Sequence, residues 1–131
     1  MKINHIGYAV KNMDKALYSF KQLGFNFEPI VNDVERNIKI TFGDKDGYRI
    51  ELVCPLNKEQ ASPVDTYLSS IGPTTYHICY QTENLDTEIE RLKEEGFKVI
   101  LEPKEAAAFG NKKVVFLMNL SLGLMEIVEE C

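Results

Sequence analysis

Residues 5–14 read His5-Ile-Gly-Tyr-Ala-Val-Lys-Asn-Met-Asp14, and residues 77–86 repeat this pattern as His77-Ile-Cys-Tyr-Gln-Thr-Glu-Asn-Leu-Asp86. Histidine, isoleucine, tyrosine, asparagine and aspartate coincide without a gap. At the same offset, the sequence from Lys21 to Phe25 matches the sequence from Lys93 to Phe97 at the lysine, glycine and phenylalanine positions. Similarity at a fixed offset indicates a duplicated structural unit. We therefore interpret the chain as two copies of one supersecondary motif.

Each copy is predicted to open with a strand and continue into a helix. Short stretches rich in apolar residues, which are typical of strands, stand at residues 3–10 and 76–82. Asn12 and Asn84 follow them, in the position of a helix N-cap. Apolar residues then recur at helical spacing until Gly24 in the first copy and Gly96 in the second. Glycine is common just past a helix end, so both helices are predicted to stop there.

Three further extended segments complete each copy. In the first copy they span residues 25–30, 37–42 and 48–54, and in the second they span residues 97–101, 112–118 and 124–129. The sequence thus predicts an α+β fold of two tandem βαβββ modules, residues 1–54 and 74–131. Residues 55–73, with a short helix-like stretch at 64–68, would be the connector. One such module has an open sheet and little core, so we expect the two to form one compact domain, a curled mixed sheet around a shared cleft.

Composition narrows the class of protein. The chain has 131 residues, 44% of them hydrophobic, and a formal net charge of −5. It has neither the basic stripe that nucleic acid requires nor the run of roughly 18 apolar residues that a membrane span requires. The N-terminal stretch lacks the apolar core of a signal peptide. The three cysteines are odd in number and widely spaced, which favours a reduced, cytoplasmic protein.

The candidate site comes from the same repeat. The only two histidines, His5 and His77, occupy equivalent positions, and Glu51 and Glu126 each stand within the apolar last strand of a copy. A single strand histidine is usually a hydrogen-bonded core residue, and a single strand glutamate usually faces solvent. Two matched pairs favour a metal site, because buried carboxylates are costly unless paired or metal-bound. Nitrogen and oxygen donors suit Zn, Ni, Co, Fe or Mn, and four of them would leave room for water or two substrate oxygens.

The pattern resembles the vicinal oxygen chelate superfamily over essentially the whole chain. Its glyoxalase I-like and methylmalonyl-CoA epimerase-like members are the most similar. The supporting segments are residues 5–10, 48–53, 62–64, 76–79, 113–117 and 123–126. The resemblance implies that His5, Glu51, His77 and Glu126 are metal ligands, that the cleft between modules is the active site, and that the protein is a homodimer.

The resemblance also implies proton transfer beside a metal-bound carbonyl of a small carbonyl compound or thioester. Glu126 would be both ligand and base. A glyoxalase I-like protein would isomerise a hemithioacetal, as lactoylglutathione lyase does, and this is our main expectation. The alternative is epimerisation of an acyl-CoA, as in methylmalonyl-CoA epimerase. Glu35, before the third strand, matches the second catalytic glutamate of the epimerases, whereas residues 118–120 replace their usual His-Pro-Lys stretch with Met-Asn-Leu.

Two other classes of the same fold are open to a sequence of this kind. One is a binding protein that sequesters an antibiotic or another planar ligand without chemistry. Such proteins commonly lack the full set of ligands, which this chain keeps. The other is an iron dioxygenase or a thiol-adding resistance enzyme, which uses two histidines and one carboxylate. A fourth ligand at Glu51 argues against that class.

Overall fold

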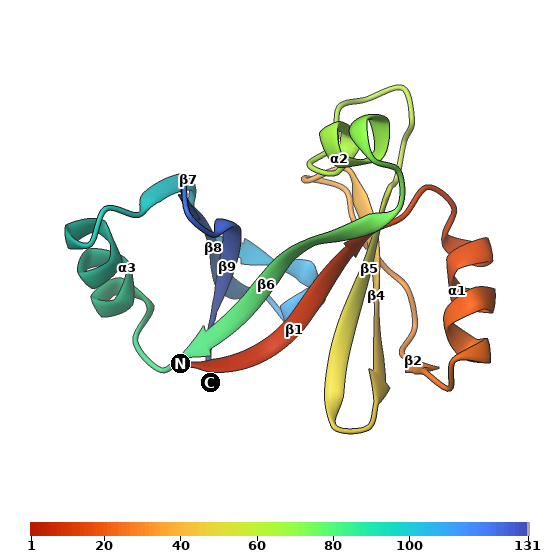
Figure 1. Cartoon of the computed structure of the whole chain (residues 1–131), viewed down its shortest axis with the longest axis horizontal. Helices are drawn as coiled ribbons and strands as arrows, with labels where there is room; N and C mark the ends of the chain where they lie inside the picture. The colour runs from red at the N-terminus through yellow and green to blue at the C-terminus, as the bar shows by residue number, and fades with distance from the viewer. Residues whose placement is uncertain (131) are drawn as a thin grey trace. The chain divides into compact units, whose positions relative to one another are not determined.

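The structure is a computed structural model that describes residues 1–130. Within this range, nine strands form a mixed sheet, and with three α-helices they make an α+β fold, which confirms the predicted fold class (Figure 1). Contacts divide the chain into two compact units. One is His5–Tyr76, and the other joins Met1–Asn4 to the chain from His77 onward. No helix in the described range is both long and apolar enough to span a membrane.

The His5–Tyr76 unit is built on strands in the order β2-β4-β5-β1, with β3 also paired to β4. Their bounds are β1 (Lys2–Ala9), β2 (Asn26–Phe27), β3 (Val31–Asp33), β4 (Ile38–Lys45) and β5 (Tyr48–Pro55). β1 runs parallel to β5, while β4 and β5 form an antiparallel hairpin. Helix α1 (Met13–Gln22) packs beside β5, as Figure 1 shows, and closes a core that includes Ile50, Leu52 and Phe25.

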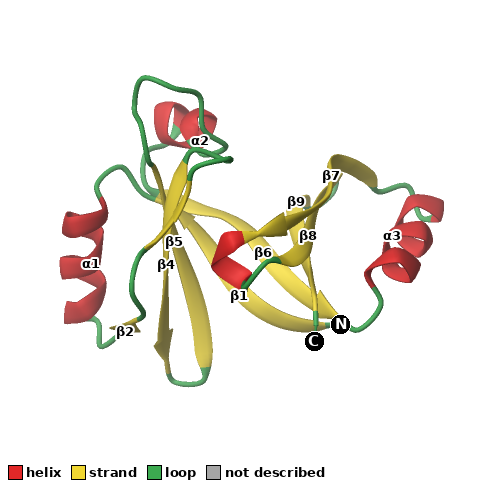
Figure 2. Cartoon of the chain, turned by 180° about the vertical axis from the view of Figure 1, so that it is seen from behind, coloured by secondary structure: helices red, strands yellow, loops and turns green. Residues whose placement is uncertain are grey.

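The other unit has the strand order β6-β9-β8-β7. Its strands are β6 (Thr74–Thr82), β7 (Lys98–Ala106), β8 (Lys112–Asn119) and β9 (Gly123–Glu129). β6 runs parallel to β9, and β8 pairs antiparallel with both β9 and β7. Helix α3 (Leu85–Glu94) lies against β7 and β9 (Figure 2). A short 3₁₀ helix (Ala107–Phe109) follows β7, and α2 (Asp65–Ser70) stands in the connector.

The helix boundaries confirm the sequence prediction. The Asn12 side chain accepts a hydrogen bond from the Lys15 backbone N–H at 2.9 Å, and the Asn84 side chain accepts one from the Thr87 N–H at 3.0 Å. Each asparagine therefore satisfies one N–H that an isolated helix end would leave without a partner. Gly24 and Gly96 follow the helix ends with φ angles of 101° and 93°, a conformation that side chains disfavour.

Two predicted strands have different bounds. Of the strand predicted for residues 25–30, only Asn26–Phe27 forms a strand, β2, and a second short strand, β3, begins at Val31. Pro29 lies between them and has no N–H to give to a ladder. The strand predicted for residues 97–101 continues as β7 to Ala106, past Pro103. Register shifts between Val99 and Leu101, and between Leu101 and Lys104, let it bend while its pairing with β8 continues.

Candidate metal centre

In the His5–Tyr76 unit, the structure brings His5 of β1 beside Glu51 of β5. The two strands are parallel neighbours, and Glu51 stands opposite Gly7, two residues past the histidine. Residues two apart on a strand share a face, so both side chains lie on one side of the sheet. His5 Nε2 lies 3.5 Å from Glu51 Oε1, and neither residue is more than 4 % exposed.

In the other unit, His77 of β6 and Glu126 of β9 form an equivalent pair. Glu126 stands opposite Cys79, again two residues past the histidine on a parallel neighbour. His77 Nε2 lies 3.2 Å from Glu126 Oε1, and both residues are buried. Both units thus have the same strand pairing, the same register and the same side-chain pair, in agreement with the repeat in the sequence.

Each pair also has an aromatic neighbour that sequence reasoning missed. Phe42 of β4 is the register partner of Glu51, and its ring centroid lies 5.4 Å from that of His5. Phe116 of β8 is the register partner of Glu126, with its centroid 5.5 Å from that of His77. Both rings meet the imidazole edge-on. The sequence feature that could have identified these neighbours is the phenylalanine in the third strand of each copy.

Charged side chains pack near the Phe42 ring. The Arg49 guanidinium carbon lies 5.0 Å from the centroid of the Phe42 ring. Two carboxylates hold that guanidinium, with Nη2 3.0 Å from Glu28 Oε2 and Nε 3.1 Å from Asp44 Oδ1. Its positive charge is therefore balanced locally, and it fixes the ring that packs on His5.

The donor atoms of each pair suit a metal ion. Imidazole nitrogen and carboxylate oxygen bind divalent metals at about 2.0–2.2 Å, so two neighbouring ligands of one ion lie about 3–3.5 Å apart. The nitrogen–oxygen separations of 3.5 and 3.2 Å fall within that range. They also lie at or beyond the upper end of ordinary N–H···O hydrogen-bond distances. Both carboxylates are buried, where an ion or hydrogen-bonding partner offsets the cost of removing their charge from water.

Glu35 has a different environment. It lies in the turn between β3 and β4, and its side chain is exposed. Asp33 fixes this turn, because its carboxylate accepts hydrogen bonds from the backbone N–H of Arg36 and from Arg36 Nη1, both at 3.0 Å. The turn is thus a defined feature of the fold, and it precedes β4 as expected from the sequence.

Comparison with known proteins identifies the family. The family model described as the Glyoxalase/Bleomycin resistance protein/Dioxygenase superfamily matches residues 4–116. The chain belongs to this superfamily. The resemblance noted in the sequence is thereby confirmed.

Similar proteins within the superfamily include epimerases. The chain is 27% identical over 119 residues to an ethylmalonyl-CoA/methylmalonyl-CoA epimerase of Cereibacter sphaeroides, covering 88% of this chain and 87% of that protein. A hypothetical protein from Bacillus halodurans has a similar structure, with 27% identity, a TM-score of 0.86 and coverage of 99% and 94% of the two chains. A Streptomyces coelicolor methylmalonyl-CoA epimerase bound to 2-nitronate-propionyl-CoA has a TM-score of 0.84 at 20% identity, covering 100% of this chain and 98% of its own.

These relatives bear on the two activities expected from the sequence. The epimerase-like alternative is the better supported, because a relative covering most of the chain has that activity. The glyoxalase I-like expectation has support only at the level of the superfamily.

Proposed function

We propose that this protein is a divalent-metal-dependent epimerase that moves a proton at the carbon beside the thioester carbonyl of an acyl-CoA. His5, Glu51, His77 and Glu126 would together hold one ion. The observation that carries the proposal is the buried histidine–glutamate pair, made in the same way in both units of a chain whose relative is an acyl-CoA epimerase.

Two considerations support a single ion shared by the pairs. Each pair offers one nitrogen and one oxygen, whereas catalytic metal sites in proteins commonly have three or four protein ligands. Both histidines also stand at points where the chain passes between its units, since the boundaries fall at Asn4–His5 and Tyr76–His77. A duplicated module that gives one ligand pair per copy is the simplest way to complete such a site.

The chain's own residues would have distinct roles. When bound, the metal would supply Lewis-acid stabilisation of the charge that develops on a substrate carbonyl oxygen. Glu126 would remove the proton from the neighbouring carbon, and the buried surroundings of its carboxylate would exclude competing water. Glu35 would serve as a second acid–base group and deliver a proton to the opposite face. Inversion needs two groups of this kind, one for each face of the planar carbon.

The relatives support the proposed substrate class. The Streptomyces coelicolor epimerase is bound to 2-nitronate-propionyl-CoA, an acyl-CoA compound. We extend a small acyl-CoA substrate to this chain, and we also propose that it acts as a homodimer.

Solvent deuterium exchange tests the proposal. In D₂O with added metal, methylmalonyl-CoA is expected to gain deuterium at its central carbon, while a glutathione hemithioacetal remains unchanged. His77→Ala should lose metal binding and deuterium exchange together. Glu102→Gln, a substitution at an exposed position of β7, should retain both. Exchange into the hemithioacetal alone would support the glyoxalase I-like activity instead. Wild-type protein that binds no stoichiometric metal would overturn the metal-dependent proposal.

The role of Glu35 has a separate readout. Glu35→Gln should retain metal and still exchange the proton of one enantiomer, since Glu126 remains. It should no longer convert that enantiomer into the other. Glu59→Gln removes another exposed carboxylate of the His5–Tyr76 unit. It is the matched control and should invert the substrate normally. Normal inversion by Glu35→Gln would remove the two-base assignment.

A further inference from the structure

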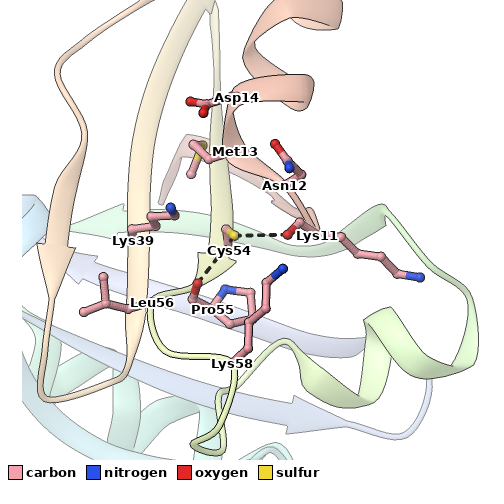
Figure 3. A pocket seen from close by; sticks show the side chains of 9 residues that line it. All are labelled: Lys11, Asn12, Met13, Asp14, Lys39, Cys54, Pro55, Leu56 and Lys58. Carbon is pink, nitrogen blue, oxygen red and sulfur yellow. Dashed lines mark hydrogen bonds between the residues drawn. The ribbon is translucent and has the colours of Figure 1, made fainter.

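We propose that a lysine-lined cavity in the His5–Tyr76 unit binds the phosphate group of a small molecule. The cavity has a volume of about 140 Å³ and lies where the end of β5 meets the start of α1 (Figure 3). This volume is several times the ~30 Å³ that one water occupies in the liquid. Its lining residues are Lys11, Asn12, Met13, Asp14, Lys39, Cys54, Pro55, Leu56 and Lys58.

The cavity concentrates positive charge in an acidic protein. Three of its lining residues are lysines, Asp14 is the only acidic one, and the chain as a whole carries a net charge of −5. Two lysines elsewhere have acidic partners, Lys45 with Asp46 at 3.0 Å and Lys93 with Glu90 at 3.5 Å. Within residues 1–130, Lys11, Lys39 and Lys58 form no ion pair. Like charges gathered in one hollow attract an anion, and a phosphate offers several acceptor oxygens to ammonium groups.

Side-chain directions support a defined site. Lys39 is the register partner of Cys54, and Figure 3 shows the ammonium ends of Lys39 and Lys58 on either side of that thiol. Lys11 stands at the rim, with its side chain leading outward. The Cys54 thiol donates to the Lys11 carbonyl oxygen at 3.5 Å, and burial raises its pKa despite the nearby lysines. The thiol therefore stays neutral and does not compensate the lysine charge.

A buried asparagine fixes the loop that carries Lys58. Asn37 Nδ2 donates to the carbonyl oxygens of Asn57, Gln60 and Ala61 at 2.9, 3.1 and 3.1 Å. Its Oδ1 accepts from the Asn57 N–H at 2.8 Å. These bonds hold the backbone on both sides of Lys58, so less order would have to be gained when an anion binds.

The cavity is distinct from the histidine–glutamate pair of the same unit. Cys54 is three residues past Glu51 on β5, and side chains at odd separations on a strand point to opposite faces. Cys54 accordingly packs in the core beneath α1, whereas Glu51 faces His5. A phosphate group bound here would be a second point of recognition, independent of the proposed metal chemistry.

Calorimetric titration of the 131-residue protein with inorganic phosphate at low ionic strength tests the site. We expect saturable binding that Lys39→Gln and Lys58→Gln each weaken at least about fivefold, because each removes a charge-assisted hydrogen bond. Lys98→Gln makes the same charge change on exposed β7 and should bind normally. Lys39→Arg should bind nearly as well as wild type, which separates lost charge from lost folding. No saturable binding, or equal affinity in all three glutamine variants, would overturn the proposal.

The source of the phosphate is resolved by parallel titrations. Inorganic phosphate, ADP, CoA and phosphate-free pantetheine are compared with wild type and Lys39→Gln. CoA binding that exceeds phosphate binding at least tenfold and depends on Lys39 would assign the site to a CoA-type tail. Equal phosphate and CoA affinities would assign it to phosphate groups in general. Pantetheine that binds as tightly as CoA would contradict a phosphate site. Failure of the deuterium exchange test would leave these results unaffected.

Discussion

The ring of Phe116 stands edge-on to the imidazole of His77, with the centroids 5.5 Å apart and 80° between the planes. Phe42 repeats this contact with His5, at 5.4 Å and 69°. Each phenylalanine is also the register partner of the glutamate in its pair. Its ring therefore lies beside both residues of the pair and limits the rotation of the imidazole. At the proposed metal site, the rings would have the supporting role that residues around metal ligands commonly play.

Phe116→Leu is expected to weaken metal binding without removing any ligand. A smaller side chain lets the His77 imidazole rotate, so ordering it on the metal costs more entropy. We expect the dissociation constant for zinc or nickel to rise about tenfold. Competition with a chromophoric chelator measures this change. Phe97→Leu, a partly buried phenylalanine packed in the core near α3, serves as control and should keep wild-type affinity. An equal loss in both variants would indicate general loosening of the unit.

Much of the fold could be predicted from the sequence because its determinants are local. The asparagine caps, the glycines after α1 and α3, and the strand alternation act within a few residues, and the repeat provides each observation twice. His5 and Glu51 could be expected to pair because His77 and Glu126 occupy the equivalent positions in the second copy. That both pairs hold one ion is still a prediction.

Other features depend on contacts between distant segments. The sequence places Asn37 at the start of a predicted strand, yet its side chain forms hydrogen bonds with a loop more than 20 positions away. Lys11, Lys39 and Lys58 are scattered charges until β4, β5 and the connector come together. Phe42 and Phe116 look like core phenylalanines, because an aromatic residue in a strand gives no sign of the imidazole it will meet.

Asn37→Asp is expected to lower the free energy of unfolding by about 2–3 kcal/mol. The substitution keeps size and shape, but a carboxylate cannot donate to the three carbonyl oxygens that Nδ2 now contacts. Aspartate also tolerates the φ of 57° at this position, so backbone strain is not the cause. Urea unfolding measures the change. Asn32→Asp, at an exposed position of β3, is the control and should be near neutral. Equal stability of both variants would mean that the loop bonds contribute little.

Gly43→Ala is expected to destabilise the hairpin of β4 and β5 by about 1–3 kcal/mol. A Cβ atom at this position would lie 2.5 Å from Cε1 of Phe27, well inside van der Waals contact. A double-mutant cycle isolates the clash: in a Phe27→Ala background, Gly43→Ala should cost much less than it does in the wild type. Strictly additive effects of the two substitutions on the free energy of unfolding would assign the cost to the backbone of β4 instead.

Ser62→Ala is expected to raise the pKa of Asp65 toward its ordinary value. The Ser62 hydroxyl donates to Asp65 Oδ1 at 2.6 Å and its backbone N–H donates to Oδ2 at 2.8 Å, and these bonds hold that pKa below the usual range. A lowered pKa stabilises the fold above the unfolded-state pKa, and this contribution is lost as the pH falls through the folded-state value. The stability difference between wild type and Ser62→Ala should therefore be greatest near neutral pH and shrink in acid. Carboxyl ¹³C titration by NMR measures the pKa directly. Ser69→Ala removes a hydroxyl of the same helix that bonds Thr66, and it should leave Asp65 unchanged.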